Sequence, residues 1–238
     1  MANAKTTARL TGAAYLVLAI AGVVGFLVVR AKIFVAGDAA VTYANYIENP
    51  SLVRLGLVAM LTVALAQAVT ALGFYKLFKD VSPTSAFAIA AFGIVNSVII
   101  LVGTAFGAAA HYYAVGGGVA PGGDQAATVQ MLAALDGFAW SVGDLFFGLW
   151  LIPMGFAVAK SGYFHRGTIL KWILVAGGVG YILTAFVSYG FADAPELLVE
   201  NLTIFADVGE LWIILALIVV GVREGAEEQE AARRGATA

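Results

Sequence analysis

The chain has 238 residues, of which 61% are hydrophobic and 12% are charged, and its formal net charge is −2. This composition leaves too few polar side chains to cover a soluble globular protein of this length, so we expect an integral membrane protein. The absence of cysteine excludes disulfides, thiol catalysis and cysteine metal sites. No basic stripe is present, and we therefore expect no nucleic-acid partner.

Apolar runs of about 20 residues recur between short polar links, and each is long enough to cross a hydrocarbon core of about 30 Å as a helix. We predict an all-α, polytopic membrane helix bundle with six transmembrane helices in residues 1–222, followed by a charged cytoplasmic tail in residues 223–238. The predicted spans are 10–29, 52–77, 84–110, 131–159, 169–189 and 202–222. The first span is followed by Arg30 and Lys32 instead of a cleavage site, so we expect it to be retained.

Local signals in the links predict how the spans begin. Asp38 is expected to cap a short helix over residues 39–48, and Ser82 with Pro83 is expected to open the third span. The glycine-rich segment 115–124 lacks the strand before it and the Lys-Ser/Thr after it that a phosphate loop requires. We therefore expect a flexible, exposed connector there.

Lysine and arginine are distributed unevenly between the links. When the links between consecutive spans are counted in chain order, three of these residues lie near the first link and none lies in the third or fifth. The other ten lie at the N-terminus, in the second and fourth links and in the tail: Lys5, Arg9, Lys76, Lys79, Lys160, Arg166, Lys171, Arg223, Arg233 and Arg234. Because basic residues favour the cytoplasmic side, this distribution predicts that both termini are cytoplasmic.

Short motifs follow one another along the chain: Arg9-Leu-Thr-Gly12, Gly37-Asp-Ala-Ala40, Arg54-Leu-Gly56, Phe146-Phe-Gly-Leu149, Ser161-Gly-Tyr163 with Arg166, and Gly209-Glu210 with Leu211-Trp212. In the order and spacing of these motifs the chain resembles the domain-of-unknown-function 4386 family of bacterial and archaeal membrane proteins, over nearly its whole length. The resemblance implies a multi-pass protein of the bacterial or archaeal cytoplasmic membrane, and it supplies no activity. Arg54 and Glu210 fall on matching positions, whereas His165 and Asp144 depart from the family pattern.

Four carboxyl side chains lie inside the predicted spans, where a charge costs several kcal/mol unless it is protonated, paired or hydrated. Asp136 and Asp144 lie two turns apart on roughly one face of the fourth span, and Asp207 and Glu210 lie one turn apart in the sixth. Together they are expected to form one outward-facing pocket that binds a small molecule or a cation. The alternative is a structural ion pair of Arg54 with Glu210 or Asp207, which would hold the second span against the sixth.

Two histidines and several neutral polar residues complete the set of candidates. His111 lies at the outer end of the third span and is either a metal ligand beside the carboxylates or an interfacial histidine without that role; the metal is unknown. His165 lies on the opposite side of the membrane, which excludes one haem bridged by both, and no cofactor is predicted. We expect interhelical hydrogen bonds from Gln67, Asn96, Thr104, Thr184 and Ser188.

These features favour a non-enzymatic membrane component, such as an accessory subunit or a binder of a small molecule or cation. Its expected surroundings are the lipid bilayer and either further copies of itself or another membrane protein. A proton- or cation-coupled secondary transporter is the alternative. A third hypothesis is an intramembrane aspartyl hydrolase that uses Asp144 and Asp207, although no residue is assigned a catalytic role.

Overall fold

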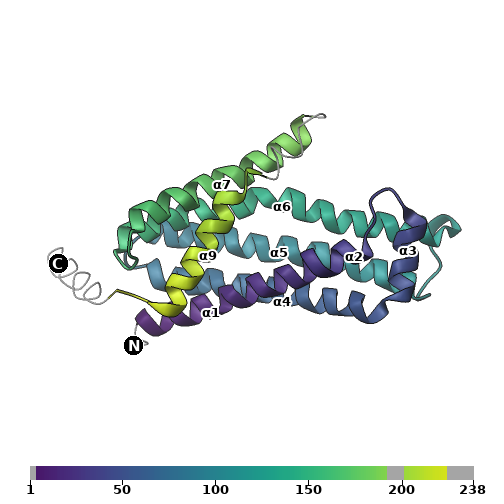
Figure 1. Ribbon diagram of the computed structural model, residues 1–238, viewed down its shortest axis with the longest axis horizontal. Coiled ribbons are helices and arrows are strands. Elements are labelled where there is room, and N and C mark those ends of the chain that lie inside the picture. Colours follow the sequence, from purple (N-terminus) through teal and green to yellow (C-terminus); the bar gives the residue numbers. More distant parts are fainter. Residues whose placement is uncertain (1–3, 192–200, 224–238) are drawn as a thin grey trace. The chain divides into compact units, whose positions relative to one another are not determined.

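The computed structural model describes residues 4–191 and 201–223, and their regular structure is helical throughout (Figure 1). One continuous helix comprises α1 (Ala4–Gly22), the π-helical segment η1 (Val23–Arg30) and α2 (Ala31–Ile33). The elements that follow are α3 (Ala39–Glu48), α4 (Pro50–Phe78), α5 (Pro83–Ala114), the 3-10 turn η2 (Pro121–Gly123), α6 (Gln125–Ser161), α7 (Gly167–Gly190) and α9 (Ile204–Val219). The protein is therefore all-α, as predicted.

Five of the described helices are long and apolar enough to cross a membrane: the continuous helix Ala4–Ile33, α4, α5, α6 and α7. Each of them contains one of the first five predicted spans, and the protein is a multi-pass membrane protein. With 16 residues, α9 is about 24 Å long and shorter than a hydrocarbon core of about 30 Å. The sixth span and the side on which the termini lie stay predictions, and residues 224–238 of the predicted tail lie outside the described range.

Local sequence signals explain several helix boundaries. The backbone N–H of Val41 donates to Asp38 Oδ1 over 3.0 Å, which caps α3 and confirms the predicted helix over residues 39–48. Pro83 begins α5, where the missing N–H is tolerated in the first turn. In the glycine-rich connector, Asp124 Oδ1 accepts from the N–H of Ala127 over 2.9 Å and so caps α6.

The chain divides into two compact units, each built from separate stretches of sequence. Unit 1 comprises residues 1–16, 67–96 and 144–238, and unit 2 comprises residues 17–66 and 97–143. The continuous first helix, α4, α5 and α6 each contribute residues to both units, whereas α7 and α9 belong to unit 1 alone and α3 to unit 2 alone.

Close backbone contacts hold the helices of unit 1 together. Figure 1 shows α7 and α9 side by side, and these two helices are in extensive contact. Between α6 and α7, a Cβ atom on Gly178 would lie 2.7 Å from the carbonyl oxygen of Gly148. Between α1 and α9, a Cβ atom on Gly12 would lie 2.7 Å from Leu217 Cβ. Small residues at these crossings let the backbones approach closely, as is common in membrane bundles.

An aromatic cluster fills the interior of unit 1. Tyr15 makes edge contacts with Phe74 and Trp150, with ring centroids 5.9 and 5.5 Å apart, and Phe74 stacks on Phe78 at 5.8 Å. All four side chains are buried. Because these residues come from α1, α4 and α6, the cluster joins three helices around one apolar centre.

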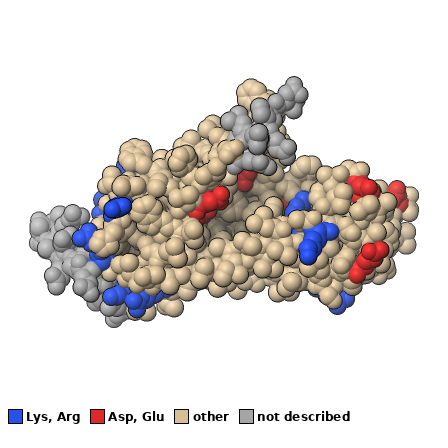
Figure 2. Space-filling model, viewed as in Figure 1, with Lys and Arg blue, Asp and Glu red and all other residues tan. Residues whose placement is uncertain are grey.

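The described basic residues of unit 1 lie at the ends of its helices. They are Lys5, Arg9, Lys76, Lys79, Lys160, Arg166, Lys171 and Arg223. Figure 2 shows basic side chains gathered at the end of unit 1 where α1 begins. This arrangement keeps cations out of the apolar middle of the unit.

Unit 2 has its own core, formed by residues of the first helix, α3, α4, α5 and α6. The buried members are Val29, Ile33, Tyr46, Val53, Ala110, Ala114, Val129 and Ala133. Across the contact of α4 with α5, the Ser97 hydroxyl donates to the carbonyl oxygen of Ala64 over 2.7 Å.

Candidate functional site

Glu210 lies in the interior of unit 1, on the side of α9 that faces the aromatic cluster. Its Oε1 accepts a hydrogen bond from the Tyr15 hydroxyl. The indole N–H of Trp150 lies close to the carboxyl group but does not meet hydrogen-bond geometry. Tyr15 and Trp150 are each 1% exposed and Glu210 is half-buried, so the carboxyl group lies against buried aromatic rings.

Two further predicted acids lie in unit 1. Tyr181 on α7 lies within electrostatic range of Glu210, Asp207 and Asp144. Asp207 is exposed and lies one turn before Glu210 in α9, whereas Asp144 lies in α6 and is half-buried.

Uncharged polar groups lie in the interior of the same unit. Among the described residues, no hydrogen-bond partner is available to Gln67 Nε2, to either side-chain polar atom of Asn96, or to Thr184 Oγ1. Gln67 and Asn96 are 1% and 0% exposed, and a Cβ atom on Gly93 would lie 3.5 Å from Gln67 Nε2. The prediction that Asn96 and Thr184 form interhelical hydrogen bonds is therefore wrong. Buried groups of this kind are usually satisfied by ordered water or a polar ligand.

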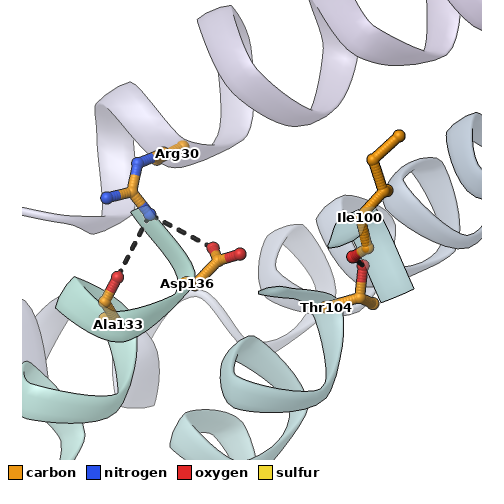
Figure 3. Close-up of polar contacts among 5 residues, drawn as sticks. All are labelled: Arg30, Ile100, Thr104, Ala133 and Asp136. Carbon is orange, nitrogen blue, oxygen red and sulfur yellow. Dashed lines mark hydrogen bonds and ion pairs between the residues drawn. The ribbon is translucent and has the colours of Figure 1, made fainter. Parts of the chain in front are cut away.

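The fourth predicted acid, Asp136, belongs to unit 2 and is paired. Arg30 Nη1 donates to Asp136 Oδ2 over 3.1 Å and to the carbonyl oxygen of Ala133 over 3.2 Å (Figure 3). The guanidinium carbon lies 4.7 Å from the ring centroid of Phe34 and 5.7 Å from that of Phe26. The two side chains form a salt bridge and are each 21% exposed.

The local backbone explains how the two charges meet. Arg30 ends the π-helical segment, whose wider turns change the face on which later side chains lie. On α5, a Cβ atom on Gly103 would lie 2.9 Å from Asp136 Oδ1, so only glycine leaves room for the carboxylate there. Thr104, the next residue, donates to the carbonyl oxygen of Ile100 over 2.7 Å within α5 (Figure 3). The prediction of an interhelical hydrogen bond for Thr104 is therefore wrong.

A small cavity of about 60 Å³ adjoins the ion pair and is lined by Arg30, Asp136, Tyr46 and Thr104 among other residues. It is large enough for a few water molecules. Tyr46 comes from α3, outside the membrane-spanning helices, and burial raises its pKa to about 12, with a further increase from the charge of Asp136.

The remaining predicted site residues stay predictions. Arg54 is exposed on α4 in unit 2, whereas Glu210 belongs to unit 1, so the predicted Arg54–Glu210 pair and the convergence of all four acids are untested. His111 Nδ1 has no hydrogen-bond partner among the described residues. Within the same range, no group of three or more His, Asp or Glu side chains is arranged to hold a metal ion.

Sequence reasoning identified the acids and missed most of their partners. The sequence shows only that Arg30 follows the first span. Its position opposite Asp136 cannot be predicted from the spans, because they do not give the order of the helices in space. Tyr15 and Trp150 lie in apolar runs and carry no signal that distinguishes them from packing residues.

Comparison with known proteins supports the resemblance found in the motifs. No curated protein and no solved structure matches the chain. A family profile described as "Domain of unknown function (DUF4386)" matches residues 10–221, and the chain therefore belongs to the DUF4386 family.

Proposed function

We propose that this protein is a non-enzymatic membrane component that reversibly binds a proton at Glu210, with Asp144 and Asp207 as the other members of the site. The observation that carries the proposal is the carboxyl group of Glu210 in an aromatic interior, held by the Tyr15 hydroxyl. A carboxylate removed from water needs a proton, a cation or a hydrated path. No salt bridge to these three acids occurs among the described residues.

The distribution of charge in unit 1 supports the proton as the bound cation. Its described basic side chains lie at the helix ends, and no triad of His, Asp or Glu suited to a metal ion occurs among the described residues. The buried amides of Gln67 and Asn96 add polar groups to the interior of the unit, where ordered water could pass a proton along.

The test measures the melting temperature of the purified protein in detergent between pH 8 and pH 5, with sodium, potassium, magnesium or calcium chloride added in separate samples. If the folded protein takes up a proton at Glu210, acidification stabilises it, because protons then bind the folded state more tightly than the unfolded state. We expect the wild type to melt at a higher temperature as the pH falls, and the Glu210→Gln variant to lose this response.

Two further variants sharpen the test. Glu48→Gln removes an exposed acid of α3 and should follow the wild type. Asp144→Asn should reduce the pH response without abolishing it, because Asp144 shares the surroundings of Tyr181 with Glu210. A Glu210→Gln variant that follows the wild type at every pH would refute proton binding. Stabilisation by one metal ion that Glu210→Gln abolishes would replace the proton by that ion.

A proton-coupled secondary transporter is the second candidate. The observation that favours it is the π-helical segment Val23–Arg30 within the first span, together with Pro153, which removes one backbone N–H donor inside α6. Interrupted helices are common at the sites of transporters. Solute flux into liposomes that depends on a pH gradient, and that Asp144→Asn abolishes, would distinguish transport from binding.

We further propose that α9 completes a sixth span and that both termini lie in the cytoplasm of a bacterium or archaeon. The basic residues at one end of unit 1 support this orientation. Because the chain has no cysteine, single cysteines can be labelled without background. In intact cells, a membrane-impermeant maleimide should label Val119→Cys, in the exposed connector, and should leave Thr168→Cys, at the start of α7, unlabelled. The opposite pattern would reverse the orientation.

A further inference from the structure

A long apolar groove runs along one face of α9 in unit 1. Its volume is about 550 Å³. The stripe Val208, Leu211, Leu215 and Val219 forms one wall, and the α6–α7 link, including Tyr163 and His165, closes one end. The four stripe residues are each about half exposed or more.

Basic groups lie at the end of the groove that the α6–α7 link closes. The backbone N–H of Arg223 donates to the carbonyl oxygen of Tyr163 over 3.1 Å, which brings the chain after α9 against that link. Arg166 follows His165 directly in the same link. The backbones of Arg166 and Arg223 therefore lie beside the residues that close this end of the groove, and neither arginine is part of its lining.

The backbone of Arg166 is unusual. Its φ is 55°, the only positive value among the described residues other than glycine. A side chain with a Cβ atom is disfavoured in this left-handed region, where glycine is unstrained. An arginine kept in a conformation that suits glycine indicates that its side chain is used.

We propose that this groove binds an anionic phospholipid, with one acyl chain along the α9 stripe and the phosphate between Arg166 and Arg223. From Val208 to Val219 the helix rises about 16 Å, which is close to half of a hydrocarbon core of about 30 Å, the depth of one leaflet. Basic pockets beside transmembrane helices bind anionic headgroups through the same chemistry. The proposal is independent of proton binding at Glu210.

The test uses the full chain, stripped of lipid in detergent and titrated with phosphatidylglycerol or phosphatidylcholine. Bound lipid is counted by native mass spectrometry, and the melting temperature is measured in parallel. We expect phosphatidylglycerol to bind at low stoichiometry and to raise the melting temperature, and phosphatidylcholine to bind at least tenfold more weakly. The double variant Arg166→Gln with Arg223→Gln should bind phosphatidylglycerol at least tenfold more weakly than the wild type.

A matched control separates a specific site from general attraction to basic residues. The double variant Lys76→Gln with Lys79→Gln removes two cations from the α4–α5 turn, outside the groove, and should bind as the wild type does. Leu215→Trp fills the groove, keeps the basic end, and should also weaken binding. Equal binding of the two lipids, or equal losses in the two double variants, would overturn the proposal. So would a lipid-independent dimer that Leu215→Trp dissociates, because the groove would then hold a second copy.

Discussion

Breaking the ion pair between Arg30 and Asp136 gives the most direct measure of what stabilises unit 2. At a separation of 3.1 Å, the attraction between the two charges is about 5 kcal/mol with an effective dielectric constant of about 20. Each side chain is 21% exposed, so water screens part of this attraction and offsets it through the loss of hydration. We expect Asp136→Asn and Arg30→Gln each to lower the free energy of unfolding by about 2–3 kcal/mol, mainly because each leaves a buried partner unpaired.

A double-mutant cycle isolates the interaction itself. Unfolding is followed by tryptophan fluorescence in mixed micelles of dodecyl maltoside and sodium dodecyl sulfate. We expect a coupling free energy of about 1.5–3 kcal/mol, the range for hydrogen bonds to charged groups. Arg54→Gln removes an exposed cation of the same unit and should change stability by less than about 0.5 kcal/mol. Additive effects of the two single variants, with a coupling below about 0.5 kcal/mol, would refute the assignment of the pair.

Three further changes test other parts of the structure. Gly103→Ala places a methyl group 2.9 Å from the ion-paired carboxylate and should destabilise the protein by about 1–3 kcal/mol. Its control is Gly22→Ala, which has open space around it and should be neutral or slightly stabilising. Unfolding in mixed micelles compares the two variants. Arg166→Gly relieves the left-handed strain and should stabilise lipid-free protein by about 0.5–1 kcal/mol, yet it should lose the extra stability that phosphatidylglycerol gives the wild type. The pKa of Tyr46 is about 12 in the folded state and about 10 in the unfolded state. The stability that the buried, neutral phenol contributes is therefore fully present below pH 10 and is lost as the pH rises to 12. Unfolding measured over that range should therefore show a fall of up to about 3 kcal/mol in the wild type that Tyr46→Phe removes; an equal fall in both would contradict it.

The helices follow from the sequence because their signals are local. A run of apolar residues satisfies its own backbone as a helix in lipid, and Asp38 and Pro83 mark helix starts through contacts with the next few residues. The division into two units carries no such signal, since it depends on how stretches far apart in the chain pack together.

The candidate sites were predicted only in part, for the same reason. The cost of a charge in lipid singles out Asp136 and Glu210 from sequence alone. Their partners, Arg30 and Tyr15, are separated from them by more than a hundred residues along the chain. Partner choice depends on helix order and on the face that each helix presents, and a π-helical segment changes that face in a way that regular helical periodicity does not anticipate.

The π-helical segment Val23–Arg30 sets the angular position of Arg30 relative to the helix before it. Because a π-helical turn holds about one residue more than an α-helical turn, restoring regular α-helix here at constant length would turn every later side chain of this helix by roughly 100°. The hydrophobic character of the span would hardly change, so membrane insertion should survive. The guanidinium group would nevertheless leave Asp136, and an unpaired carboxylate would remain beside Gly103.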